Sequence, residues 1–170
     1  MTLFDQLDKN QLKELLIKCW MTHDGAWFYN CYNELGIKAA NKLNKLAIKN
    51  LSAIEVQRVK KAMGMENETI STFEQFKTFI NNIFSVVKGD FMNFIYSFPQ
   101  ENCLHWEMNR CFAHEGMKRI GISDLYECGI LYRVSCWLNI LGIKHRISPK
   151  FKKCLLYSQE ICFGEIIFDL

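Results

Sequence analysis

The chain has 170 residues, of which 49% are hydrophobic and 14% aromatic, and this composition excludes a disordered chain. Its 21 basic and 18 acidic residues give a net charge of +3, without the basic footprint of a nucleic-acid-binding protein. No stretch approaches the roughly 18 uninterrupted apolar residues of a membrane span. The first residues, MTLFDQLDKN, contain acids and lack the apolar run of a signal peptide. We therefore expect a cytoplasmic protein with no nucleic-acid or membrane partner.

The first part of the chain predicts helices. Apolar residues recur at helical spacing over 12–20, after Asp8, which is a suitable N-cap. The same stripe resumes over 27–35 and ends at Gly36, a residue that commonly terminates helices. A further stripe over 37–50 predicts the next helix.

Two more helices follow before residue 89. Ser52 and Glu55 have the spacing of a capping box, which predicts the start of a helix that ends at Gly64. Ser71 or Thr72 then begins a helix rich in phenylalanine.

Near residue 89 the pattern changes to one typical of strands. The segments 91–98 and 103–110 are rich in aromatic residues, and a turn cluster at 99–102 separates them. Apolar and polar residues alternate in the second segment, so the two segments predict a β-hairpin.

The remaining chain completes an α+β fold. Helices are expected at about 111–120 and 124–141, and the tail 152–170 predicts a second hairpin that turns at Ser158-Gln159-Glu160. The chain is thus predicted to be a single domain. A helical part, about 1–88, packs with a β-β-α-α-β-β unit, about 89–170, that forms a small antiparallel sheet.

The sequence is rich in cysteine. In a reducing compartment such residues are thiols, ligands or reactive groups and rarely a disulfide framework. No CxxC pair occurs, so the zinc-ribbon and thioredoxin signatures are absent. The eight cysteines are Cys19, Cys31, Cys103, Cys111, Cys128, Cys136, Cys154 and Cys162.

The segment RCFAHEGMKRIGISDLYECGILYRVSCW concentrates three of these thiols near a histidine. If its two helices pack as a close antiparallel pair, Cys111, His114 and Cys136 converge, whereas Cys128 is harder to include. Cys162, which faces another thiol across the tail hairpin, is a candidate fourth ligand. Thiolates with an imidazole suit zinc or iron. The spacing matches no recognised zinc signature, however, and packing thiols with a capping histidine remain the alternative.

The segment WMTHDGAWFY interrupts an apolar stripe with two titratable residues. His23 and Asp24 lie between Trp20 and Trp27, so we expect a buried, hydrogen-bonded pair. In a structural interpretation Asp24 caps a helix that begins at Gly25. In a functional one, Asp24 orients His23 as a general base or as a metal ligand.

Arg133 lies among apolar residues on a helix that we expect to be covered. A guanidinium stays charged there and needs an anion. The sequence offers Glu115 as an internal partner, and the carboxylate of a bound ligand is the alternative. We expect the second, because Cys111 and His114 would lie within one turn of Arg133 across the helical pair.

Four motifs carry a resemblance: MTHDGAWFYN, CFAHEGMKRIG, YECGILYRVSCW and CFGEIIFD. Together they resemble a family of small cytosolic proteins of unknown function from anaerobic bacteria and archaea. Their layout is similar to that of the L-2-amino-thiazoline-4-carboxylic acid hydrolase-like proteins, in which cysteine motifs follow a helical N-terminal half. The resemblance implies opening of a small cyclic amidine or thiazoline that bears a carboxylate. It places the cysteines of the pattern at Cys111, Cys128 and Cys162, whereas the helix argument favours Cys136 over Cys128.

The leading expectation is a metal-binding, hydrolase-like protein that acts on a small carboxylate-bearing molecule. Zinc or iron would polarise the scissile bond or activate water, His23 or His114 would move protons, and Arg133 would hold the carboxylate. One alternative is a non-catalytic module that senses a small ligand, a metal or redox state. Another is a homodimer with an interface in the aromatic run 73–98.

Overall fold

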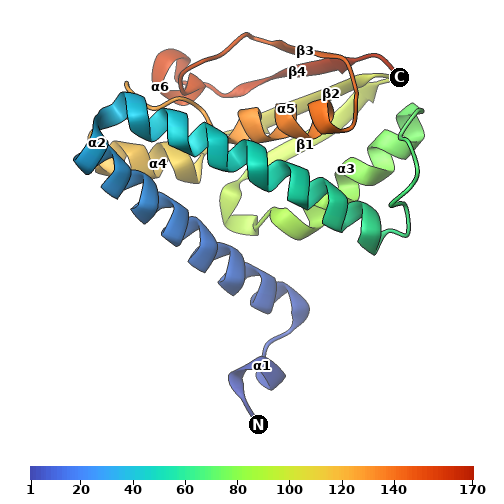
Figure 1. The fold of residues 1–170 in the computed structure, drawn as a ribbon, viewed down its shortest axis with the longest axis horizontal. Coiled ribbons are helices and arrows are strands. Elements are labelled where there is room, and N and C mark those ends of the chain that lie inside the picture. Colours follow the sequence, from blue (N-terminus) through green and yellow to red (C-terminus); the bar gives the residue numbers. More distant parts are fainter.

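The structure is a computed structural model that describes residues 1–170, and it combines helices with one four-stranded antiparallel sheet (Figure 1). The α+β class predicted from the sequence is confirmed, with a helical N-terminal half followed by strands and shorter helices. The elements in chain order are α1 (Leu3–Gln6), α2 (Lys9–Ala62), α3 (Phe73–Val87), a 3-10 turn (Asp90–Met92), β1 (Phe94–Gln100), β2 (Cys103–Met108), α4 (Phe112–Arg119), α5 (Ile130–Ile140), β3 (His145–Ser148), α6 (Leu155–Gln159) and β4 (Phe163–Phe168).

Helix α2 is two helices joined by a kink. At Gly36 the backbone has φ 75° and ψ 168°, a conformation that residues with a Cβ rarely adopt, so the predicted stop at Gly36 is confirmed. Helix α1 and the part of α2 before the kink, residues 9–35, project from the body, and we call the two together the arm (Figure 1). The part after the kink, residues 37–62, lies along α5.

The predicted capping box at Ser52 is wrong. No glycine or proline interrupts the chain there, so the helix continues, and the Ser52 hydroxyl donates to the Ile48 carbonyl 2.7 Å away. The other two helix starts are confirmed. Asp8 accepts from the Gln11 amide at 2.8 Å, and Thr72 caps α3.

The sheet has the order β1-β2-β4-β3, with every neighbouring pair antiparallel. The first hairpin, β1–β2, is confirmed. The predicted tail hairpin is wrong, because α6 occupies its turn and β4 pairs with β2 and β3. Strand β3 comes from the basic segment 144–150, whose charged side chains suit a short strand at the edge of a sheet.

The core lies between the sheet and helices α3 and α5. Phe84 of α3 contacts Phe94 of β1 and Trp137 of α5, with ring centroids 5.1 and 5.6 Å apart. Phe76 packs against Phe168 of β4 at 4.4 Å. Several aromatic side chains of the run 73–98 are therefore used inside the fold, and the homodimer interface expected there stays a prediction.

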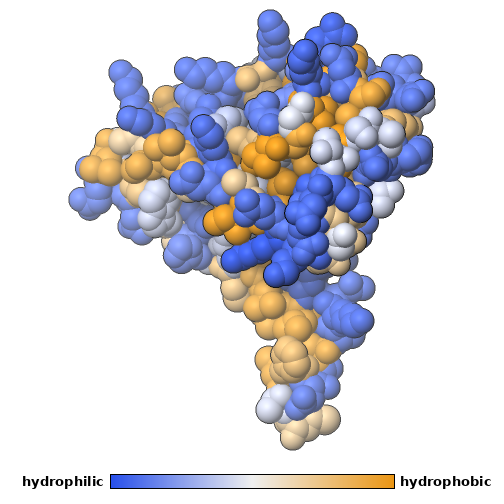
Figure 2. All heavy atoms as spheres, turned by 45° about the vertical axis from the view of Figure 1, so that its right-hand side comes forward, coloured by the Kyte–Doolittle hydropathy of each residue, from blue (hydrophilic) through white to orange (hydrophobic).

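Apolar side chains are exposed on the arm instead. Figure 2 shows apolar atoms along the narrow projection at the bottom of the molecule. Leu3, Phe4, Leu15 and Leu16 are all exposed. Although α2 has 54 residues, neither it nor any other helix contains an apolar stretch able to cross a bilayer.

Candidate functional site

Four thiols gather where helices α4, α5 and α6 begin. Cys111 is the N-cap of α4, and Cys154 is the N-cap of α6. Cys128 precedes Gly129, the N-cap of α5, and Cys162 directly precedes β4. We call these four residues the thiol cluster.

The thiols lie close enough to disfavour one another's ionisation. The pKa of Cys128 is raised to about 12 and that of Cys162 to about 11, chiefly by burial and in part by negative charge on Cys111 and Cys154. Burial also raises the pKa of Cys111, again with a contribution from Cys154. In the metal-free protein the thiols of Cys111, Cys128 and Cys162 are therefore neutral at physiological pH.

N–H groups surround the sulfur atoms. Backbone N–H groups in the first turn of α4 face Cys111, and those in the first turn of α5 face Cys128, and in each case they lower the pKa of the thiol. The His114 Nδ1 lies 3.5 Å from the Cys154 sulfur. The fully buried Trp106 indole has no nitrogen or oxygen acceptor, and its N–H lowers the pKa of Cys162. These donors would stabilise thiolates.

The cluster differs from the set favoured by the helix argument. Cys136 lies outside it, where Tyr132 and Ser52 contact its thiol at the boundary between α5 and α2. The predicted close pair of helices is wrong because α5 begins only at Ile130, after an irregular segment that brings Cys128 to Cys111. In the present side-chain arrangement, no group of three or more His, Cys, Asp or Glu residues is placed to hold a metal ion.

The sequence alone does not place Cys154 among the ligands. Its only signal is the nearness of Cys162 in the chain, which the predicted tail hairpin explains as a contact between its two strands. The actual cause of their proximity is α6, which places Cys154 at its N-cap and Cys162 just beyond its C-terminal end.

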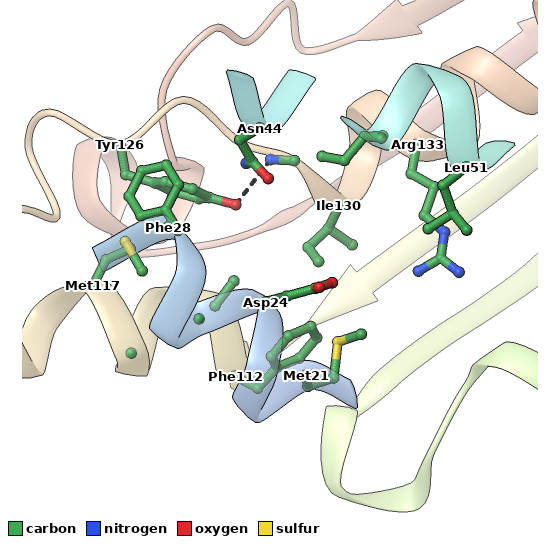
Figure 3. Close-up of a pocket in the computed structure, with 15 residues that line it drawn as sticks. Met21, Asp24, Phe28, Asn44, Leu51, Phe112, Met117, Tyr126, Ile130 and Arg133 are labelled. Atoms are coloured by element: carbon green, nitrogen blue, oxygen red, sulfur yellow. Dashed lines mark hydrogen bonds between the residues drawn. The ribbon is translucent and has the colours of Figure 1, made fainter. Parts of the chain in front are cut away.

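A cleft of about 180 Å³ lies beside the cluster (Figure 3). It separates the arm from α4, α5 and the second half of α2. Most of its lining is apolar and includes Met21, Phe28, Phe112 and Ile130, while Asp24 and Arg133 are its only charged residues.

Tyr126 stands between the cleft and the thiol cluster. Its ring lines the cleft, and its hydroxyl accepts a hydrogen bond from the Gly129 amide at 3.1 Å. Burial raises the pKa of Tyr126, and the nearby thiols, chiefly Cys128, raise it further. The cleft and the cluster thus share one wall.

His23 and Asp24 do not form the buried pair that the sequence predicted. Their side chains are 77% and 52% exposed, and His23 Nδ1 lies 3.7 Å from Asp24 Oδ1. The helix runs through both residues without a break, so Asp24 caps nothing, and the arm leaves this part of the helix open to water. Figure 3 shows Asp24 pointing into the cleft, where partial burial raises its pKa despite the opposing effects of His23 and Arg133.

Arg133 is paired with an acid inside the protein. Its Nε donates to Glu55 Oε2 at 2.9 Å, and its Nη2 makes a second hydrogen bond to Glu55 Oε1. Trp137 Nε1 donates to the same carboxylate at 3.0 Å. The expected partner Glu115 instead lies near Arg110. The expectation that Arg133 waits for a ligand carboxylate loses its support, since a bidentate partner already faces the guanidinium.

Comparison with known proteins identifies a family. Residues 5–156 match the family of unknown function DUF6125. The chain belongs to this family. The DUF6125 match includes the cleft and three cysteines of the cluster, Cys111, Cys128 and Cys154, and ends before Cys162. No curated protein and no solved structure matches the chain, so the resemblance to thiazoline hydrolase-like proteins has no support from these comparisons.

Two glycines of this DUF6125 chain keep the cleft open. Gly25 lies inside α2 and Gly116 inside α4, both line the cleft, and an added Cβ would meet nothing within 4 Å at either position. Close packing therefore does not require glycine there. Since glycine inside a helix costs about 0.5–1 kcal/mol relative to alanine, we expect Gly25→Ala and Gly116→Ala each to stabilise the protein by about that amount. Urea unfolding followed by circular dichroism measures the change, and a loss of stability would show that these positions have no room for a methyl group.

Proposed function

We propose that this protein binds a metal ion, zinc or iron, through the thiol cluster and His114. The observation that supports the proposal is that four cysteines, at the starts of α4, α5, α6 and β4, lie near enough to affect the pKa values of one another. Thiolate and imidazole are the ligands that these metals prefer.

The surroundings of the cluster favour a cation. Cys111, Cys128 and Cys162 resist ionisation, because they are buried and because a neighbouring thiolate repels a second negative charge. A divalent ion removes that conflict, because its charge stabilises all the thiolates at once while N–H groups satisfy their remaining lone pairs. The buried N–H group of Trp106 has no other acceptor. A charged Cys162 sulfur would accept a hydrogen bond from it.

Binding requires the side chains to move, because no three ligands are now placed around one point. A cysteine side chain can turn its sulfur by changing between staggered rotamers about the Cα–Cβ bond. A position for water or a substrate atom stays open when only three of the five donors bind the metal, as in catalytic zinc sites.

The proposal includes a hydrolase-like activity on a small molecule in the cleft. His114, at the cluster, is the histidine placed to move protons when thiols alone hold the metal, since His23 is largely exposed to solvent. The metal would activate water or polarise the scissile bond. Arg133 has no part in substrate binding here, because Glu55 is its partner.

A non-catalytic ligand sensor is the second candidate. The cleft lies where the arm meets α4 and α5, so a ligand there would contact both the projecting helix and the body. Turnover that depends on metal would favour the hydrolase, whereas ligand-induced stabilisation without turnover would favour the sensor.

The metal site is tested by the metal content of protein purified without oxygen or chelator. We expect about one zinc or iron per chain in the wild type and loss of that metal in Cys154→Ser. Cys136→Ser is the matched control, because it removes a buried thiol outside the cluster and should leave the metal content unchanged. Metal-free wild-type protein in which all eight thiols react freely would contradict the proposal.

A further inference from the structure

The cleft contains three residues that do not serve the stability of the protein. Gly25 and Gly116 weaken their helices without a packing reason. Asp24 loses part of its hydration at the cleft, and the nearby positive charges do not fully compensate for that loss. Several residues that lower the stability of a protein and lie together at one cleft are typical of a binding site.

The charges at the cleft do not cancel. The positive charge of Arg133 is matched by Glu55, with the two side chains only 14% and 10% exposed. Asp24 has no such bidentate partner: the exposed His23 lies 3.7 Å from its carboxylate, and Arg133 lowers its pKa through charge. Since Glu55 matches Arg133, the carboxylate of Asp24 is the charge in the cleft lining that no buried cation matches.

We propose that the cleft binds a small organic cation, an amine whose ammonium group pairs with Asp24 and whose apolar part packs between the arm and α4. The inference rests on the proposed use of the cleft as a ligand site and is independent of the metal. It changes the expected substrate class, because a carboxylate-bearing molecule would meet Asp24 as a like charge and would find Arg133 occupied.

Size and lining limit the apolar part of the ligand. Cavities of about 150 Å³ hold one benzene ring, so a cleft of about 180 Å³ suits a ring or a short branched chain with an aminoalkyl group. Phe112, Met21 and Ile130 offer aromatic, thioether and aliphatic surfaces to such a group. The Phe112 ring also adds a face that attracts an ammonium group.

The test uses three probe amines, benzylamine, phenethylamine and isoamylamine, each beside its neutral alcohol and its carboxylate of similar size. Binding to the full chain is measured by ligand-observed NMR, and the metal content of each sample is determined in parallel. We expect millimolar or tighter binding of at least one amine, weaker binding of its alcohol, and no binding of its carboxylate. Asp24→Asn should weaken amine binding about tenfold and leave the alcohol unaffected.

Two further variants make the result decisive. Glu34→Gln removes an exposed carboxylate on the same arm outside the cleft and should leave amine binding unchanged. Gly116→Leu fills the cleft and should weaken amine and alcohol alike. Binding of the carboxylates as tight as that of the amines, no binding of any amine, or an Asp24→Asn variant that binds amines normally would each overturn the inference. Amine binding by samples that were purified without oxygen or chelator and still hold no metal would support this inference and contradict the proposed metal site alone.

Discussion

Arg133→Met is expected to destabilise the protein by about 3–5 kcal/mol, because it leaves the Glu55 carboxylate buried without its cation. Only the Trp137 indole would still donate to that carboxylate. The guanidinium also lies over the rings of Trp20 and Trp137, at 4.9 and 5.4 Å from their centroids, so the substitution removes packing as well as charge. Chemical denaturation followed by circular dichroism measures the loss.

A double variant separates the contribution of the ion pair to stability from the cost of leaving one of its charges without a partner. Arg133→Met with Glu55→Met leaves no stranded charge, so it should recover most of the stability that Arg133→Met loses. A near-neutral single variant would mean that the pair contributes little and that Arg133 is free to serve a ligand, which would restore the substrate anchor expected from the sequence.

This pair also shows why the sequence did not predict the partner of Arg133. Glu55 is 78 residues away in the chain, and its spacing from Ser52 suggested a helix cap. Only the packing of α2 along α5 brings it to the guanidinium. The need of a buried arginine for an anion was predictable from local sequence, whereas the identity of the anion depended on tertiary structure.

Local signals predicted the elements that depend on local physics. Gly36 ends a helix because its backbone conformation excludes most other residues, and the alternation in 103–110 correctly predicted β2. The prediction of a tail hairpin failed because β4 pairs with β2 and β3, which are distant in the chain. The short helix α6 occupies the expected turn. Cys128 lies in the irregular segment before α5, and Cys154 lies at the start of α6. Helical spacing in the sequence could not predict that these two residues lie close together.

The extent to which His23 and Asp24 on the arm are buried also could not be predicted from local sequence. Their place between Trp20 and Trp27 predicted burial, which assumes that every apolar stripe is covered. Trp27 is itself exposed, although the neighbouring Phe28 is buried against Tyr126, because only one face of this helix meets the body. The pattern correctly predicted a helix, but the sequence did not reveal which part of that helix would meet the core.

Gly164→Ala is expected to destabilise the protein by about 3 kcal/mol or more, since it adds an atom where the sheet has no room. Gly164 of β4 pairs with Trp106 of β2, and the indole ring lies directly over it. A Cβ there would overlap the Ser148 carbonyl oxygen as well as the indole, 2.7 Å from Trp106 Cζ2, and neither a backbone oxygen nor a fully buried ring gives way easily. Urea unfolding followed by circular dichroism measures the loss.

Gly116→Ala is the matched control for this substitution. The same methyl group is added at a position with no atom within 4 Å, so the two variants should change stability in opposite directions. Gly164→Ala should also reduce the metal content under the proposed function, because a displaced Trp106 no longer directs its N–H at Cys162. If Gly164→Ala proved as stable as the wild type, the indole would not lie against β4, and the donor assigned to Cys162 would be lost with it.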